Sequence, residues 1–191
     1  MRKVILASSS PRRAEILRKS GIPFDIDVGG YEEDMTENVP PEELAKKLAL
    51  GKALSVALRH PDAFIIGADT FISFNGVVLG KPHTAQKARE MLRMLSGNTH
   101  QVLTGYAIVD TASGEQANGV STSSVTFRKL TDREIGEYID SGEPLDRAGA
   151  YAIQGGAEKF VSRIEGDYLS IVGLPLNVII EELRRLGFTD R

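Results

Sequence analysis

Hairpin patterns interrupt the alternation of strand-like and helix-like segments in this chain. Asn75-Gly76, the strongest short hairpin signal in the sequence, stands between two short strand-like runs. A longer hairpin is predicted around Asp110–Gly114. A simple βαβ repeat contains no such hairpins, so we predict a mixed α/β fold built on a bent sheet.

Apolar periodicity and capping residues predict the individual elements. The predicted strands are Val4–Ala7, Phe24–Val28, Ala63–Ala68, Phe71–Phe74, Val77–Leu79, Thr99–Val109, Val120–Phe127 and Lys159–Ile164. The predicted helices are Pro11–Lys19 after the N-cap Ser10, one from Pro40-Pro41 to about His60, one from Thr84 to Ser96-Gly97, one from the capping box Thr131–Glu134 to Gly142, and Leu176–Leu186. The acidic stretch Tyr31–Asn38 is expected to be a loop.

The bulk composition is that of an ordinary soluble protein. The 191 residues are enough for one substantial core, and we expect a single domain over residues 1–191. A net charge of −3 argues against broad binding to nucleic acid, and the absence of cysteine excludes disulfides and thiolate metal sites. The first apolar run is too short for a signal peptide, and no stretch is long enough to span a membrane, so we expect a cytoplasmic protein without membrane contact.

The segment Ser8-Ser9-Ser10-Pro11-Arg12-Arg13 lies between a predicted strand and the start of a helix. Backbone N–H groups at a helix start favour an anion, and guanidinium groups fit phosphate oxygens. These residues therefore indicate a phosphate site. The alternative is that Ser10 merely caps the helix while both arginines point into water.

A carboxylate follows the buried apolar run Phe64–Ala68 directly, at Asp69-Thr70. An acid at the end of a buried strand is costly unless it is paired, hydrogen-bonded or bound to a metal, so Asp69 is a candidate ligand or catalytic residue. The alternative is an aspartate that caps a turn. Lys52, Lys81 and Glu32 or Glu33 could add the charges that a triphosphate and a hard cation need, although each alone is more typical of a solvated side chain.

The glycine-rich segment Gly149–Ala157 permits a close approach of the backbone to a ligand. Within it, the amide of Gln154 can both donate and accept hydrogen bonds, which suits the edge of a nucleobase. The alternative is a tight turn that leads into the next strand.

Taken in order, these segments resemble the Maf family, also called the septum-formation protein family, of nucleotide pyrophosphatases. The matching motifs are Leu6-Ala7-Ser8-Ser9-Ser10-Pro11-Arg12-Arg13, Gly67-Ala68-Asp69-Thr70, Gly80-Lys81-Pro82, Leu95-Ser96-Gly97 with Thr99-His100-Gln101-Val102, Gly149-Ala150-Tyr151-Ala152-Ile153-Gln154-Gly155, and Val172-Gly173-Leu174-Pro175-Leu176. The resemblance implies an elongated α/β fold of two lobes with a central cleft, similar to inosine triphosphate pyrophosphatases. It also implies hydrolysis of a nucleoside triphosphate to the monophosphate and pyrophosphate with Mg²⁺ or Mn²⁺.

The resemblance also implies roles for individual residues. Asp69 matches the catalytic acid residue, and Asp69 with Glu33 matches the metal site. The phosphate-binding positions correspond to Ser8, Ser10, Arg13, Lys52 and Lys81, whereas Arg12, Thr70 and Gln154 match the positions that mark the branch acting on dTTP and UTP.

Other readings remain open at the level of the sequence. One is a nucleotide-binding regulator of septum formation without turnover, and another is a pyrophosphatase for 7-methyl-GTP or ITP. The resemblance further suggests a homodimer. Ala152 stands where the family commonly has glycine, and would be strained if that residue needed a positive φ.

Overall fold

One mixed sheet runs through the computed structural model, which describes residues 2–35 and 37–189. Its order is β2-β1-β3-β5-β6-β7, and β4 pairs with the far end of β3. The strands are β1 (Lys3–Leu6), β2 (Asp25–Ile26), β3 (Ala63–Phe74), β4 (Val77–Leu79), β5 (Thr99–Asp110), β6 (Gln116–Phe127) and β7 (Val161–Glu165). Only β2, β1 and β3 pair in parallel, and every other pairing is antiparallel.

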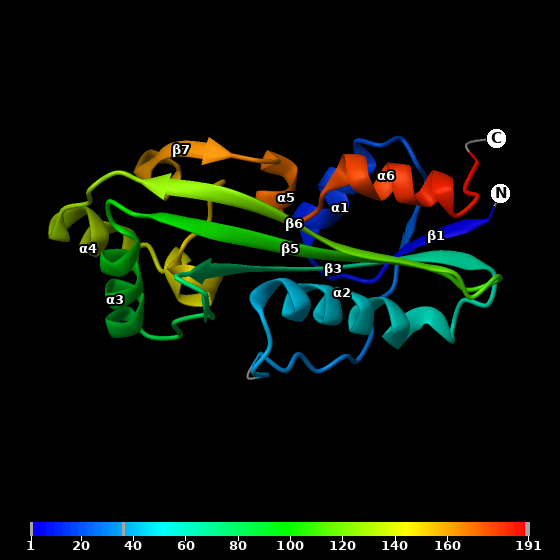
Figure 1. Cartoon of the computed structure of the whole chain (residues 1–191). Helices are drawn as coiled ribbons and strands as arrows, with labels where there is room; N and C mark the ends of the chain where they lie inside the picture. The colour runs from blue at the N-terminus through cyan, green and yellow to red at the C-terminus, as the bar shows by residue number, and fades with distance from the viewer. Residues whose placement is uncertain (1, 36, 190–191) are drawn as a thin grey trace.

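The helices gather at the two ends of this elongated sheet (Figure 1). They are α1 (Pro11–Arg18), α2 (Pro41–Ala57), α3 (Ala85–Leu95), α4 (Asp132–Asp140), α5 (Tyr168–Val172) and α6 (Leu176–Arg185). At one end α2 covers one face while α1 and α6 lie on the other, and at the opposite end are α3, α4 and β7. The long strands β3, β5 and β6 join the two ends, so the expected α/β fold with a mixed sheet flanked by helices is confirmed.

Local sequence signals placed most boundaries within a few residues. Asn75 and Gly76 have φ of 50° and 78°, as the predicted hairpin turn requires. Thr131 and Glu134 form the predicted capping box of α4. The short helix α5, which was not predicted, is capped by Asp167, whose carboxylate accepts from the backbone N–H groups of Leu169 and Ser170.

The predicted break of a strand at Asp69-Thr70 is wrong. Ala63–Ala68 and Phe71–Phe74 belong to one continuous strand, β3, because β5 pairs with it without interruption from Phe64↔Asp110 to Ser73↔Gln101. Asp69 and Thr70 therefore lie in the middle of a strand, where their side chains point to opposite faces of the sheet.

Two glycines allow α2 to lie unusually close to the sheet. A Cβ atom on Gly67 of β3 would stand 2.2 Å from the carbonyl oxygen of Ala49, and one on Gly105 of β5 would stand 1.9 Å from that of Ala45. Neither position leaves room for a larger residue, since both contacts are with backbone. This close packing brings Lys52, on the same helix, over the middle of β3.

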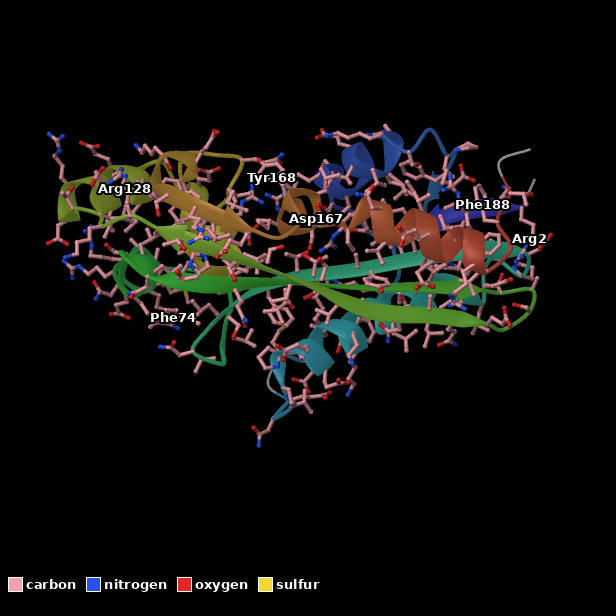
Figure 2. All side chains as sticks on the ribbon, turned by 45° about the horizontal axis from the view of Figure 1, so that its top comes forward. Arg2, Phe74, Arg128, Asp167, Tyr168 and Phe188 are labelled. Carbon is pink, nitrogen blue, oxygen red and sulfur yellow. The ribbon has the colours of Figure 1, made fainter. Side chains whose placement is uncertain are left out.

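Figure 2 shows Arg2 and Phe188 at one end of the molecule and Arg128 at the other. The Arg2 guanidinium lies 4.1 Å from the centre of the Phe64 ring, and Phe188 meets the same ring edge-on. Burial of Phe64 and its neighbours anchors the terminal segments to the sheet.

Candidate active site

The candidate site lies at a gap along one edge of β3. The pairing of β1 with β3 ends at Leu6↔Ile66, and the pairing of β4 begins at Ile72. Among the described residues, no strand pairs with this edge of β3 between those two points. Asp69 and Thr70 therefore lie beside the carboxyl end of β1, where sheets of this kind usually place ligands.

A cleft of about 700 Å³ opens at this gap. The predicted site residues on its wall are Ser8, Ser10, Arg12, Arg13, Glu33, Lys52, Thr70, Lys81 and Gln154. Asp69 itself is buried behind the wall, with 6% of its surface exposed. Its carboxylate accepts a hydrogen bond from Lys52, which does line the cleft. The positions that the sequence singled out thus converge on one cleft, although they come from distant segments.

Arg13 is held on the cleft wall rather than released into water. Its Nε donates to the carbonyl of Gly173 at 3.0 Å, Nη1 to Ser8 Oγ at 3.2 Å, and Nη2 to Thr70 Oγ1 at 3.4 Å. Removal from water lowers the pKa of Arg13, while the charges of Asp69 and Glu33 oppose this shift. An arginine remains charged at neutral pH even so, and the cleft therefore holds a fixed cation at the start of α1.

The side chain of Ser10 makes no capping hydrogen bond to α1, so the alternative that Ser10 serves only as a helix cap is not supported. The hydroxyl of Ser8, which is 7% exposed, instead accepts from the Ser10 backbone N–H at 3.2 Å. The loop is consequently folded on itself beside the helix start, where free N–H groups and the helix dipole favour an anion.

Two carboxylates share the ammonium group of Lys52. Lys52 Nζ lies 2.7 Å from Glu33 Oε1 and bonds Asp69 Oδ1 on its other side. The Lys52 side chain is 15% exposed, whereas that of Glu33 is 45% exposed. Two acidic oxygens arranged around one cation are the kind of donor set that Mg²⁺ uses together with substrate phosphates. The described residues contain no group of three or more acidic or histidine side chains gathered as metal ligands.

Lys81 also lines the cleft, in a looser setting than Lys52. Its ammonium group bonds Asp146 Oδ1 at 2.8 Å, and both side chains are at least half exposed. Arg147, which the sequence analysis did not assign to the site, also lines the cleft. Burial first, and then the charges of Arg147 and Arg13, lower the pKa of Arg12.

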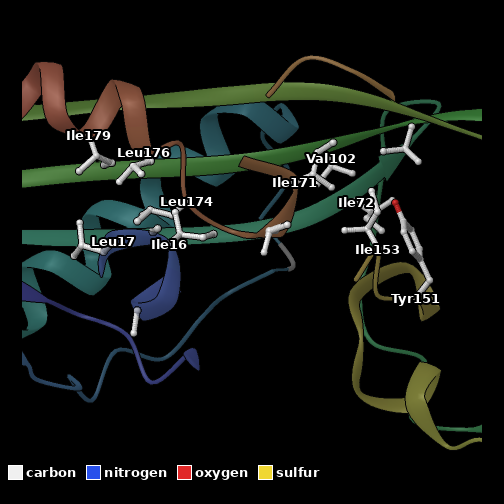
Figure 3. Close-up of a cluster of buried hydrophobic side chains, with 14 of the residues drawn as sticks. Ile16, Leu17, Ile72, Val102, Tyr151, Ile153, Ile171, Leu174, Leu176 and Ile179 are labelled. Atoms are coloured by element: carbon white, nitrogen blue, oxygen red, sulfur yellow. The ribbon is translucent and has the colours of Figure 1, made fainter. Parts of the chain in front are cut away.

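One part of the cleft wall is apolar. Figure 3 shows Ile72, Ile153 and Tyr151 together, with Val102 and Ile171 nearby, and all five line the cleft. Tyr151 and Ile153 belong to the glycine-rich segment that the sequence singled out, whereas Ile72 and Ile171 were missed because they look like ordinary core residues.

His100 fixes the Tyr151 side of that wall. His100 Nε2 lies 2.7 Å from Tyr151 Oη, and the His100 ring meets those of Phe127 and Tyr151 edge-on. Burial lowers the pKa of His100 to about 4, so the ring is neutral at pH 7. Ala152 is not among the residues with positive φ, so the strain considered for it does not arise; the left-handed residues here are Gly149 and Ala150.

A cleft that gathers arginine and lysine side chains opposite two carboxylates is typical of proteins that bind a polyphosphate with a divalent cation. The Maf-like protein family model matches residues 3–186, and the chain belongs to the Maf family. No helix of the described residues is long and apolar enough to cross a membrane.

Relatives resemble the chain over nearly its whole length. The dTTP/UTP pyrophosphatase of Geobacillus sp. (strain WCH70) is 47% identical over 188 residues, which cover 98% of this chain and 100% of that protein. The dTTP/UTP pyrophosphatase of Bacillus cereus (strain AH820) is 45% identical over 187 residues, 98% of this chain and 97% of that one. Among solved structures, the Ham1 protein of Staphylococcus aureus is 13% identical with a TM-score of 0.42, covering 65% of this chain and 71% of that chain.

Proposed function

We propose that this protein hydrolyses dTTP and UTP to the nucleoside monophosphate and pyrophosphate. The observation that carries the proposal is the convergence of Arg13, Lys52, Lys81 and Glu33 on one cleft, with Asp69 bonded to Lys52 behind the wall. Full-length relatives at 45–47% identity bear the name dTTP/UTP pyrophosphatase, which supports the same substrates here.

In the proposed mechanism, the chain's own cations hold the triphosphate. Arg13 and the Ser8–Ser10 loop bind phosphate oxygens, while Lys52 and Lys81 neutralise charge that builds up as pyrophosphate leaves. A phosphate oxygen gives Lys52 a new partner, which exposes Asp69 to the water that attacks the α-phosphorus. Asp69 then orients that water and accepts its proton.

The same cluster fits a divalent cation. Asp69 and Glu33 already share one positive charge, that of Lys52, so their oxygens would hold Mg²⁺ or Mn²⁺ against the phosphates. Such a cation would neutralise phosphate oxygens and lower the pKa of a bound water.

Arg12, Thr70 and Gln154 are the proposed specificity residues for the pyrimidine nucleoside. Gln154 and Arg12 lie on the cleft wall beside the apolar residues Tyr151 and Ile153, against which a base could rest. An exposed amide and a nearby flat apolar surface suit an uncharged ring with polar edges.

The deciding experiment is a set of initial rates on UTP, dTTP, CTP, 7-methyl-GTP and ITP, with Mg²⁺ or Mn²⁺ and with a chelator. We expect UTP and dTTP to be hydrolysed fastest, with equal amounts of monophosphate and pyrophosphate released, and the chelator to stop the reaction. Tight binding of UTP without any pyrophosphate release would instead support a regulator of septum formation.

We also propose a cytoplasmic homodimer in which residues 1–191 form one domain. Sedimentation at several protein concentrations tests the dimer, since a monomer at micromolar concentration would contradict it. Limited proteolysis that releases a stable fragment would contradict the single domain.

A further inference from the structure

Thr104, a residue that plays no part in the proposed mechanism, lies directly behind the cleft. It stands opposite Thr70 in the register of β3 and β5 and is 0% exposed. Its hydroxyl donates to the carbonyl of Ser170 at 2.7 Å. A threonine hydroxyl carries one proton, so this bond uses the only proton that Thr104 has.

The single hydroxyl proton of Thr104 also fixes the direction of the hydrogen bond between Thr70 and Thr104. Thr70 Oγ1 and Thr104 Oγ1 are 2.8 Å apart, and Thr104 has no second proton to give. Thr70 must therefore be the donor. Arg13, which can only donate, directs Nη2 at Thr70 Oγ1 from 3.4 Å. A one-way chain results, in which Arg13 donates to Thr70, Thr70 to Thr104, and Thr104 to the Ser170 carbonyl.

The far end of this chain is held rigidly. Ser170 is buried in α5, and Asp167 accepts from the backbone N–H of Ser170 at 3.1 Å. The Ser170 carbonyl is thus a fixed acceptor that keeps the Thr104 proton in place. Thr70 lines the cleft with its proton turned inward and one lone pair left over.

We propose that Thr104 is a positioning residue that holds Thr70 as a pure hydrogen-bond acceptor, so that the cleft selects nucleotides presenting a hydrogen-bond donor at this point. The inference rests on the proposed function and deepens it. Uracil and thymine carry a donor at the imide N3–H, whereas cytosine has an acceptor at N3. UTP and CTP carry the same sugar hydroxyls, so the imide is the donor that can favour UTP over CTP.

Two other occupants of the Thr70 lone pair are disfavoured by the surroundings. Phosphate oxygens are acceptors and gain nothing from an acceptor. A metal ion would meet the positive guanidinium of Arg13, which already donates to the same oxygen. A hydrogen-bond donor on the uncharged nucleoside can bond the Thr70 lone pair and brings no positive charge next to Arg13.

The test compares Thr104→Val with the matched variant Thr104→Ser, which keeps the hydroxyl. In Thr104→Val the Thr70 proton loses its partner and can rotate toward the cleft. We expect the ratio of kcat/KM for UTP over CTP to fall at least ~10-fold in Thr104→Val, because an unmade buried hydrogen bond no longer penalises cytosine. Thr104→Ser should keep the ratio within ~3-fold of the natural protein.

Two substrate analogues identify the donor. 3-Methyluridine triphosphate lacks the imide N3–H, and 3′-deoxyuridine triphosphate lacks a sugar hydroxyl. We expect Thr104→Val to narrow the gap in kcat/KM between UTP and the 3-methyl analogue and to leave the gap between UTP and the 3′-deoxy analogue unchanged. The reverse pattern would assign the donor to the sugar and overturn the inference. A uniform loss for all substrates, or an unchanged ratio, overturns the inference. So does an equal drop in Thr104→Ser and Thr104→Val.

If Thr104→Val does not fold, as judged by circular dichroism and melting, Thr70→Ser and Thr70→Val serve the same purpose. The serine variant should retain the preference for UTP and the valine variant should lose it, and equal ratios in both would overturn the inference. Absence of UTP and dTTP turnover in the natural protein would contradict the proposed function, whereas turnover without the shift in selectivity contradicts this inference alone.

Discussion

The charged and the apolar sides of the cleft are built on different principles. On the charged side, Lys52 and Lys81 are bound to carboxylates through long side chains, and the side chains of Glu33 and Lys81 are about half exposed. On the apolar side, Tyr151 and Thr70 are fixed by the buried partners His100 and Thr104. Lys81, which must exchange its partner for a phosphate, is loosely held, whereas groups that read the shape and polarity of a nucleoside are preorganised.

The largest effect is expected from Asp69→Asn, which keeps the shape and removes the charge. We expect turnover to fall by at least ~10²-fold and up to ~10⁴-fold, the range for loss of a positioned acid–base group, while nucleotide binding largely survives. Steady-state kinetics and calorimetric titration with UTP measure the two quantities. Near-normal turnover would remove Asp69 from its proposed role.

On the preorganised side, His100 should show its effect in the pH dependence of stability. Burial lowers the pKa of His100 from 6.5 to about 4, so the unfolded chain takes up a proton in this range before the folded one does. The neutral, buried ring of His100 therefore contributes its full share to the free energy of unfolding above pH 6.5, and this share is lost as the pH falls to about 4. At about 1.36 kcal/mol per pKa unit, the loss is roughly 3 kcal/mol.

His100→Gln keeps a polar partner for Tyr151 without a titrating ring. Urea unfolding at several pH values should show a shallower fall in the free energy of unfolding between pH 6.5 and 4 than in the natural protein. Parallel curves for the two proteins would mean that His100 titrates normally.

On the charged side, Lys81→Ala should weaken binding more than chemistry. Its ammonium group lines the cleft and is bound to the exposed carboxylate of Asp146. Loss of one charge-assisted contact to a phosphate weakens binding about tenfold. We therefore expect KM for UTP to rise ~10-fold, with a smaller change in kcat. A fall in kcat at constant KM would place Lys81 at the transition state instead.

The sequence predicted what local chemistry determines and missed what depends on distant partners. The turn at Asn75-Gly76 and the capping box at Thr131 follow from a few adjacent residues, and both are present. The continuity of β3 through Asp69 depends on its partner β5, which lies some thirty residues further along the chain. A polar pair in an apolar run looks like a strand end until that pairing is known.

The same division holds for the candidate site: local motifs predicted residues that line the cleft, but not the contacts that orient them. Motifs and the family resemblance brought Ser8, Arg13 and Gln154 to attention, and all three lie on the cleft wall. The contacts that orient these groups were not predictable, because Arg13 bonds Gly173 at a separation of 160 residues. The resemblance names positions, whereas hydrogen-bond direction at Thr70 follows only from the geometry of three elements.

The smallest effect is expected from Asp146→Asn, the counterpart of Lys81→Ala. The Lys81 ammonium lowers the pKa of Asp146, yet the carboxylate is 80% exposed, and ion pairs of this kind contribute little to stability. Releasing Lys81 removes a competitor for the incoming phosphate, so KM for UTP should stay constant or fall by up to ~3-fold, with the melting temperature unchanged. A marked rise in KM would show that Asp146 positions Lys81 for the substrate, and that the charged side is also preorganised at this point.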